Sequence, residues 1–260
     1  MSWKRFPFDA APYRHTAASL APLWPRLHAG DVEPWPDDPR VVAAWCAFHA
    51  GDFESAVARG LAADAAGARA GLTVANKAQA LYATYLEDRE EARRSLLLEV
   101  AERAARRTRE DAADPNAWYT LAYALGRHAQ SLSVAQALAQ GVGLRVKRAL
   151  ETTVRLAPRH ADAHVALGAF HAEVIDKVGA LLGLAQGASR EAGLAAFRTA
   201  LRLHPSSAIA MVEAARGFVM LEGPGRQAEA TRLLEAAAAH VPLDATEHLD
   251  VERAKAELED

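Results

Sequence analysis

One pattern of residues occurs twice in the C-terminal part of this chain, and it limits the fold more than any other feature. Residues 164–205 read as a helix of small residues, a turn, an amphipathic helix and a proline, and residues 211–242 repeat that order. When both stretches are aligned on the final proline, the matched positions are Phe197 with Leu234, Ala200 with Ala237, and Leu167-Gly168 with Ala214-Ala215. A helix–turn–helix unit of about 34 residues cannot bury its apolar face alone, so neighbouring units have to stack into an α-solenoid.

The spacing of apolar residues and prolines extends this prediction to the rest of the chain. Apolar residues recur every three or four positions nearly throughout, and alternating β-branched stretches are scarce, which predicts an all-α fold. Proline cannot continue a helix, so the prolines after amphipathic stretches mark junctions between helical hairpins. These junction prolines are Pro115, Pro158, Pro205 and Pro242. We therefore expect a Pro-rich segment at 1–40, with a short helix packing on the solenoid, and a repeat domain at 41–260 with about four to five hairpins.

The N-terminal half contains weaker copies of the unit. The tetrapeptide His-Ala-Gly-Asp occurs at 28–31 and again at 49–52, and Gly-Asp is typical of a tight turn between helices. Residues 74–88 and 90–111 are predicted to form a helical pair. A third pair is expected to begin at Asp114, whose side chain can cap the helix that follows.

Two insertions separate the helices of later pairs. They span about 131–143 and 176–189, and both are rich in small or apolar residues. Insertions in repeat proteins tend to gather on one face. They either fold into the concave side and close a pocket, or they lengthen helices and cover an apolar edge. The last stretch, 246–258, is amphipathic and is predicted to cap the end of the solenoid.

The order of these features resembles known repeat families. The unit length and matched positions are similar to the tetratricopeptide repeat. The succession Trp118-Tyr119, 147–158, 163–168, Leu182-Gly183 and Ala188-Ser189 resembles the regulator-of-microtubule-dynamics-like family and the helical-repeat partner of tripartite transporters. The resemblance covers about residues 74 to 258. It implies a helical-repeat protein that binds proteins or small ligands and shares no catalytic residues with its relatives. We identify neither a signal sequence nor a membrane anchor, so transport and microtubule roles are not carried over.

Composition excludes several classes of function. The net charge is −3, whereas nucleic-acid binders usually show a basic excess, so no nucleic-acid partner is expected. The single Cys46 excludes an intramolecular disulfide framework and a Cys-rich zinc site. No signal peptide and no uninterrupted apolar run of about eighteen residues is recognisable, which predicts no membrane insertion and a cytoplasmic location. The abundance of Ala and Arg is typical of a bacterial sequence.

The candidate binding residues come from repeat positions that usually face the concave side. In the third pair these include Asn116, Tyr119, Tyr123 and Arg127, and Arg216 has the same role in the fifth. Tyr119, Tyr123 and Arg127 lie four residues apart and share one helical face. Two phenols and a guanidinium form a platform that suits a peptide carboxylate, since Arg binds carboxylates bidentately. The alternative is that the tyrosines fill gaps in the core and Arg127 is solvated. Three residues of the preceding pair extend the same wall in this prediction: Lys77, Tyr82 and Tyr85.

Other residues with chemical potential are assigned to structure. His160 and His164 lie four residues apart, and His164 shares a helical face with His171. A zinc site needs a third or fourth ligand beyond such a pair, and His164 and His171 are at repeat positions that normally pack between helices. Cys46 lies beside Trp45 and is expected to be an inert core thiol. No arrangement of acid, base and nucleophile is recognisable, so we predict no catalytic site, no metal and no cofactor.

These observations leave two functions open. The first is a non-enzymatic protein- or peptide-binding scaffold that uses a concave groove. The second is a binding protein for a small apolar or carboxylate-bearing ligand, with the cavity closed by the insertions. The leucines of the second insertion distinguish them, because they would cap a cavity in the second case: Leu181, Leu182 and Leu184. The partner is a protein or peptide of unknown identity, and formation of a homo-oligomer stays open.

Overall fold

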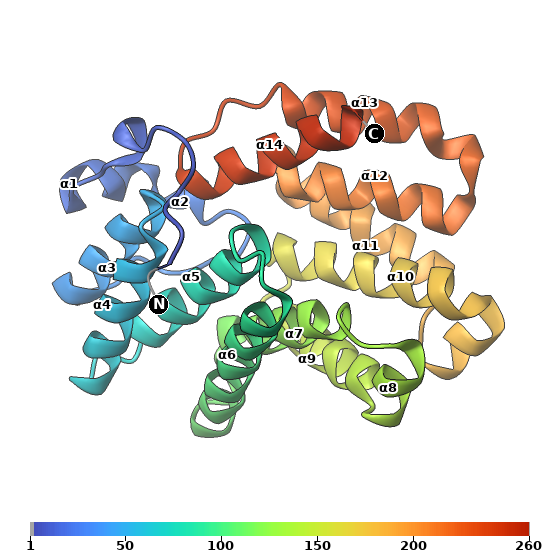
Figure 1. Cartoon of the computed structure of the whole chain (residues 1–260), viewed down its shortest axis with the longest axis horizontal. Helices are drawn as coiled ribbons and strands as arrows, with labels where there is room; N and C mark the ends of the chain where they lie inside the picture. Colours follow the sequence, from blue (N-terminus) through green and yellow to red (C-terminus); the bar gives the residue numbers. More distant parts are fainter. Residues whose placement is uncertain (1–2, 260) are drawn as a thin grey trace. The chain divides into compact units, whose positions relative to one another are not determined.

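Helices make up the structure of this chain. The computed structural model describes residues 3–259, and within that range it contains α-helices, short 3-10 helices and no strand (Figure 1). The all-α prediction is therefore confirmed. No helix in this range combines the length and the apolar character needed to cross a lipid bilayer.

Two compact units make up the chain, and each is described by itself. Unit 1 comprises the described residues up to His28, Glu33–Ser131 and Pro242–Thr246. Unit 2 comprises Ala29–Val32, Leu132–Val241 and the described residues from Glu247 onward. The boundary near residue 131 falls at the start of the first predicted insertion.

Short helices and aromatic side chains form the beginning of unit 1. The elements are η1 (Ala11–Tyr13), α1 (Ala17–Leu20), η2 (Ala21–Leu23) and α2 (Trp24–Leu27). Trp24 stacks on His28 with ring centroids 3.8 Å apart and meets the edge of Trp45 at 5.4 Å. Its indole N–H donates to the carbonyl oxygen of Glu33 at 2.8 Å. These buried contacts attach the N-terminal segment to the first long helix.

Five long helices follow and form two layers. They are α3 (Pro39–His49), α4 (Phe53–Ala65), α5 (Gly71–Tyr85), α6 (Glu90–Glu110) and α7 (Pro115–Ala129). Each helix packs against the next, and α5 also packs against α3 and α7. The helices α3, α5 and α7 therefore lie side by side in one layer, with α4 and α6 packed against it.

Capping aspartates stand at the beginning of three of these helices. The side chains of Asp38, Asp52 and Asp114 each accept a hydrogen bond from a backbone N–H in the first turn of α3, α4 and α7, as capping residues do. The predicted cap at Asp114 is confirmed. The tetrapeptide at 49–52 joins α3 to α4, with Gly51 at φ +78°. The copy at 28–31 instead ends α2 and leads into non-helical chain before α3.

Unit 2 is also built from antiparallel helices that pack on their neighbours. Its elements are α8 (Val134–Ala139), α9 (Val142–Leu156), α10 (Ala161–Ala185), α11 (Arg190–Leu203), α12 (Ala208–Glu222), η3 (Pro224–Arg226), α13 (Gln227–Ala238) and most of α14 (Ala245–Glu259). From α9 to α13 each long helix packs against the next, and α10 also contacts α12. Val251 and Ala254 of α14 join the apolar cluster between α12 and α13, so α14 covers the end of this stack.

Small residues allow the helices of both units to approach closely. The Phe197 ring of α11 packs against Gly168 of α10 and Gly217 of α12, and a Cβ at Gly168 would lie only 2.7 Å from that ring. In unit 1, Gly60 of α4 faces Gly71 of α5, and a Cβ at Gly60 would lie 2.5 Å from the carbonyl oxygen of Gly71. A side chain larger than hydrogen would displace the Phe197 ring at Gly168 or Gly217, and the backbone of the facing helix at Gly60 or Gly71.

We expect Gly168→Ala to lower the free energy of unfolding by about 1–3 kcal/mol, because the added methyl group overlaps the Phe197 ring. Gly143→Ala in the same unit is the matched control, since its Cβ would meet one atom at an ordinary 3.7 Å. That variant should be unchanged or stabilised by up to about 1 kcal/mol. Urea unfolding followed by circular dichroism measures both. Equal stability of the two variants would contradict the close packing of Phe197.

Candidate functional site

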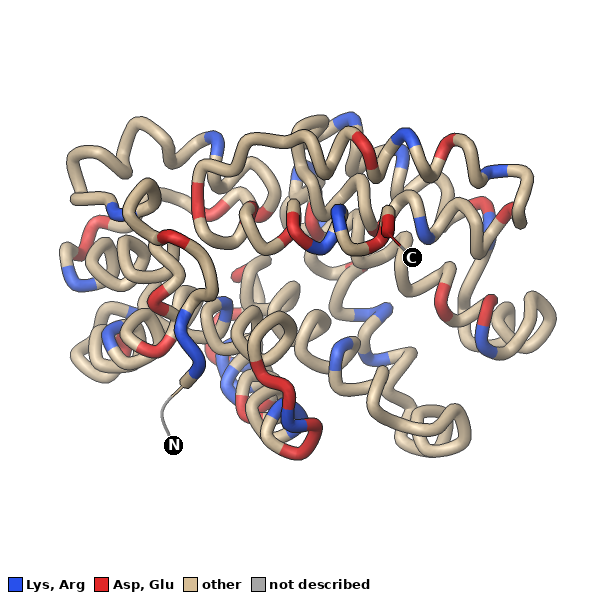
Figure 2. The backbone as a smooth tube through the Cα atoms, turned by 45° about the horizontal axis from the view of Figure 1, so that its top comes forward, with Lys and Arg blue, Asp and Glu red and all other residues tan. Residues whose placement is uncertain are grey.

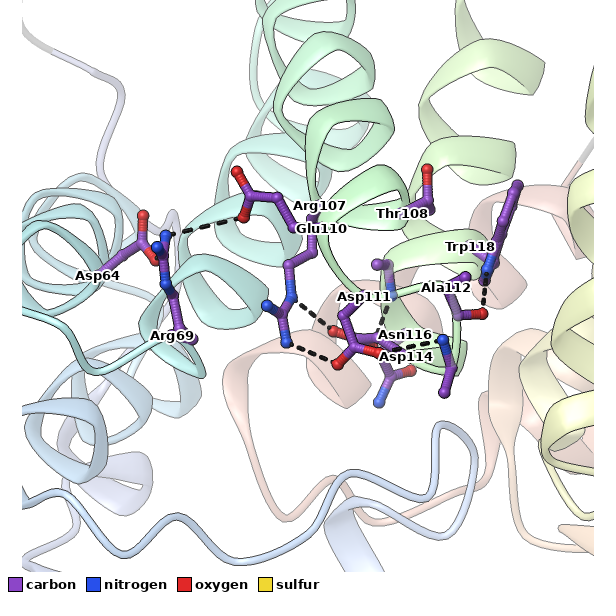
Figure 3. A network of polar contacts seen from close by, with 12 residues as sticks. Asp64, Arg69, Arg107, Thr108, Glu110, Asp111, Ala112, Asp114, Asn116 and Trp118 are labelled. Carbon is purple, nitrogen blue, oxygen red and sulfur yellow. Dashed lines mark hydrogen bonds and ion pairs between the residues drawn. The ribbon is translucent and has the colours of Figure 1, made fainter.

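Polar contacts hold the first turn of α7, the helix that carries most of the candidate residues. Arg107 of α6 donates to Asp114 at 3.0 Å and to Asp111 at 3.2 Å (Figure 3). The indole N–H of Trp118 donates to the carbonyl oxygen of Ala112 at 3.0 Å. The start of α7 is thus fixed against the end of α6, and this orients the side chains along α7.

Three of the predicted residues lie together on α7. The rings of Tyr119 and Tyr123 are 6.2 Å apart and tilted by 48°. The guanidinium carbon of Arg127 lies 5.3 Å from the centroid of the Tyr123 ring, within the range of a cation–π contact. The hydroxyl of Tyr123 is 3.0 Å from the hydroxyl of Thr84 in α5. All three side chains are half-buried, so each keeps part of its surface in contact with solvent.

Asn116 has a different environment from the other α7 candidates. It is 6% exposed, and its side-chain amide donates to the carboxylate of Glu33, which is 8% exposed. A buried amide that is hydrogen-bonded to a buried carboxylate satisfies both polar groups. Asn116 therefore stabilises the interior of unit 1.

Arg216 belongs to unit 2, where it lies on α12. Its Nε donates to Glu257 of α14 at 2.6 Å. Glu257 also pairs with Arg253 at 3.3 Å, and Arg253 pairs with Glu213 of α12 at 3.1 Å. These ion pairs join α12 to α14. The structure thus brings Tyr119, Tyr123 and Arg127 together and places Arg216 in a separate network.

Two of the residues expected to extend the wall on α5 have their own contacts within unit 1. Lys77 Nζ lies 5.9 Å and 5.7 Å from the ring centroids of Trp45 and Phe48 in α3. Tyr82 is 2% exposed, and the Trp3 ring stacks on it with a centroid distance of 3.9 Å. Lys77 therefore lies at the α3–α5 contact, while the N-terminal segment covers Tyr82.

A buried cluster of titratable groups in unit 1 was not anticipated from the sequence. His49 Nδ1 lies 2.7 Å from a carboxylate oxygen of Asp244, and its Nε2 lies 3.3 Å from His28 Nε2. Thr246 donates its hydroxyl hydrogen to the same carboxylate. His28 and His49 open the two copies of the repeated tetrapeptide, which was the one available signal. Asp244 is 195 residues away from His49, so nothing in the sequence connects them.

Burial limits what this cluster can do chemically. His28, His49 and Asp244 are 3%, 1% and 2% exposed. The rings of Trp24 and Trp45 pack against His28. A substrate in solution has no access to groups that are this deeply buried. The cluster therefore acts as a link that holds 242–246 on α3.

The histidines with helical spacing in unit 2 take part in local hydrogen bonds. His160 Nδ1 accepts from the backbone N–H of Ala163 at 3.1 Å and caps α10. His171 Nδ1 accepts from the backbone N–H of Ser189 at 3.2 Å. His164 Nε2 lies 3.1 Å from the carbonyl oxygen of Pro158. Within residues 3–259 no group of three or more His, Cys, Asp or Glu is placed to hold a metal ion.

Cys46 is a partly buried free thiol. Burial raises the pKa of the Cys46 thiol, which keeps it in the protonated form. Since the thiolate is the reactive species, this environment is typical of a packed cysteine.

We expect the hydrogen bond between Tyr123 and Thr84 to contribute about 0.5–1.5 kcal/mol to the free energy of unfolding. Tyr123→Phe, Thr84→Val and the combined variant form a double-mutant cycle that isolates this contact from the bond of Thr84 to Ala80. Urea unfolding of the four proteins gives the coupling energy. A coupling energy of zero would mean that the two hydroxyls do not interact.

We expect His171 to make unfolding depend on pH. Burial, assisted by Lys147, lowers the pKa of His171, so the unfolded chain takes up the proton first as pH falls. The contribution of His171 to the free energy of unfolding is therefore complete above about pH 6.5, and it is lost as pH falls below that value. In His171→Asn an amide oxygen replaces Nδ1 as the acceptor for Ser189 and cannot titrate. Its unfolding midpoint should change less between about pH 7.5 and 5.5. An unchanged pH dependence would rule out this contribution.

No model of a known protein family matches this chain, and no curated protein sequence is significantly similar to it.

Proposed function

We propose that this chain is a tetratricopeptide-type α-solenoid that binds a segment of another protein and has no enzymatic activity. Its hairpins are α3–α4, α5–α6, α10–α11 and α12–α13, and α14 is the capping helix. In support, α5 contacts α3 and α7, and α10 contacts α12, as the first helices of successive repeats do. The matched repeat residues are also buried, since Phe197, Ala200, Leu234 and Ala237 are at most 8% exposed.

The observation that favours protein binding is the arrangement of Tyr119, Tyr123 and Arg127 on α7. The bond to Thr84 fixes the Tyr123 ring, and the ring in turn supports the guanidinium of Arg127. A guanidinium held in this way loses little conformational entropy when it binds a carboxylate. The half-buried phenol rings beside it offer apolar contact to a peptide side chain.

The binding surface we propose is smaller than the one expected from repeat positions. It consists of Tyr119, Tyr123 and Arg127 together with the adjacent part of α5. Asn116 is buried against Glu33, and Arg216 pairs with Glu257 in unit 2, so neither belongs to it. The composition with a single Cys46 and abundant Ala and Arg leads us to place the protein in the cytoplasm of a bacterium.

The alternative, a small ligand enclosed by the insertions, has less support. Leu181, Leu182 and Leu184 are 84%, 63% and 67% exposed. Side chains that line a closed apolar cavity are shielded from solvent, and these leucines are not. The exposed leucines therefore favour the protein-binding function over the enclosed ligand.

The experiment is affinity capture from a native lysate of the source cells, with cross-links mapped to residues. We expect a protein that cross-links to α5 and α7 and whose recovery falls at least about tenfold with Tyr119→Ala/Arg127→Ala. Arg216→Ala is the matched control and should retain the partner, because Arg216 lies outside the proposed surface. Thermal unfolding of all three proteins shows that the fold is kept.

Equal recovery by wild type and the double variant would overturn the proposal for this surface. If no protein is recovered, native mass spectrometry of the purified chain tests for a bound small molecule, which would favour the alternative.

A further inference from the structure

Two glycines with positive φ bound a short arm in the second insertion of unit 2. Gly179 interrupts α10 at φ 78°, and Gly187 follows α10 at φ 74°. Glycine adopts such conformations readily, since it has no Cβ. Residues 180–186, called the arm below, form the last stretch of α10 and the turn after it (Figure 1). Rotation of the backbone at the two glycines would redirect the arm and leave its helical turn intact.

The arm is weakly attached. Its large apolar side chains are 84%, 63% and 67% exposed: Leu181, Leu182 and Leu184. Residues 178–189 contain no charged side chain, so the arm forms no ion pair (Figure 2). Gly183 is buried beside Ile175 and Ala188, which attaches the arm to the main part of α10 and to the turn before α11. The position of the arm therefore depends on that turn, which comprises residues 187–189.

His171 of α10 holds the turn 187–189. His171 is 6% exposed, and its Nδ1 accepts a hydrogen bond from the backbone N–H of Ser189 at 3.2 Å. A backbone N–H can only donate, so this bond requires a lone pair on Nδ1 and places the proton of the neutral ring on Nε2. Ser189 Oγ in turn accepts from the backbone N–H of Ala192 and caps α11. Neutral His171 thus fixes the junction between the arm and α11.

Protonation of His171 removes this hydrogen bond. Both ring nitrogens of an imidazolium carry hydrogen, so Nδ1–H and the Ser189 N–H would face each other as two donors. A buried cation without a partner is costly unless water reaches it. The turn 187–189 lies directly beside the ring, and the arm attached to it is weakly packed. Movement of this turn therefore hydrates the charged ring with little loss of packing.

The charged groups around His171 come from α9, α10, α11 and α12. Most of them are engaged in ion pairs: Lys147 with Glu151, Glu173 with Lys177, and Arg190 with Glu222. Glu191 accepts a hydrogen bond from Ser189 Oγ at 3.0 Å, and Asp176 is exposed on α10. Burial lowers the pKa of His171 from the ordinary value of 6.5, Lys147 lowers it further, and Glu151 acts in the opposite direction. His171 is therefore neutral at pH 7 while the turn is in place.

We propose that His171 is a pH-sensitive latch for the arm: the neutral ring holds the arm against α10 and α11, and protonation releases it. In the released state the ring is in water and binds a proton with its ordinary affinity, which is higher than its affinity in the latched state. Proton uptake therefore favours release as pH falls below about 6.5. Because one proton is involved, the ratio of released to latched molecules rises by at most about tenfold per pH unit.

Nuclear magnetic resonance of the full ¹⁵N-labelled chain between about pH 7.5 and 5 tests the latch. The ring nitrogens of His171 report its protonation. Amide hydrogen exchange, corrected for the intrinsic rate at each pH, reports opening at Ser189. We expect the protection of the Ser189 amide to fall by up to about tenfold per pH unit as His171 titrates. The amide of Ala215 in buried α12 should stay more strongly protected at every pH, which distinguishes local release from global unfolding.

Three variants separate the latch from other effects. His171→Asn supplies an amide oxygen as the acceptor for Ser189 and cannot titrate, so the protection of Ser189 should no longer change with pH. His164→Asn is the matched control and should behave like wild type, because His164 lies on the same helix and contacts the carbonyl oxygen of Pro158, outside the arm. Lys147→Met removes a positive charge near His171, so the midpoints of His171 and Ser189 should shift together to higher pH.

The proposal is overturned if His171 titrates with no corresponding change in the exchange of Ser189, or if the two midpoints separate in Lys147→Met. Equal protection of Ser189 and Ala215 in acid would assign the change to global unfolding and overturn it as well. A His171 ring that stays neutral across the pH range, or a wild-type pH profile in His171→Asn, would rule out His171 as the latch.

Discussion

The close approach of helices through glycine and alanine is the constraint on which both units depend. The backbones of α4 and α5 meet at Gly60 and Gly71, and the Phe197 ring occupies the space that Gly168 and Gly217 leave open. At such distances the dispersion contacts of many atoms add up. A methyl group added at one of these glycines would displace the ring or backbone that it meets. Because the long helices of each unit pack against their neighbours, a shift at one crossing affects the other helices of that unit.

Buried polar pairs hold the segments that do not repeat. Asp244 reaches His49 from the far end of the sequence, and Glu33 reaches Asn116 across 83 positions. Removing one partner of such a buried hydrogen-bonded pair typically costs about 1–3 kcal/mol, because the other group is left buried without a partner. These pairs therefore determine where the segments around 33 and 244 lie, which helical periodicity does not specify.

The side chains on α7 and the exposed leucines of the insertions differ in how they are held. On α7 the tyrosine and arginine side chains are supported by each other and by Thr84, so their geometry exists before a partner arrives. In the insertions the leucines have few neighbours and follow glycines that bend the backbone. A preorganised polar and aromatic face suits recognition of a defined segment.

The sequence by itself determined the helices and the residues that pack between them. The proline junctions, the cap at Asp114 and the buried positions of Phe197 and Leu234 follow from helical periodicity and local hydrogen bonding, which act over a few residues. The face shared by Tyr119, Tyr123 and Arg127 was predicted for the same reason.

Only the tertiary structure decided which of the candidate residues face solvent. Asn116 has the helical spacing of a site residue, yet its side chain is buried and hydrogen-bonded to Glu33. Arg216 forms an ion pair with Glu257. The leucines of the second insertion looked equally suited to capping a cavity and to covering helices, but they stand in solvent beyond the break at Gly179. Their exposure depends on contacts between segments far apart in the sequence, and a pattern that repeats every few residues carries no information about such contacts.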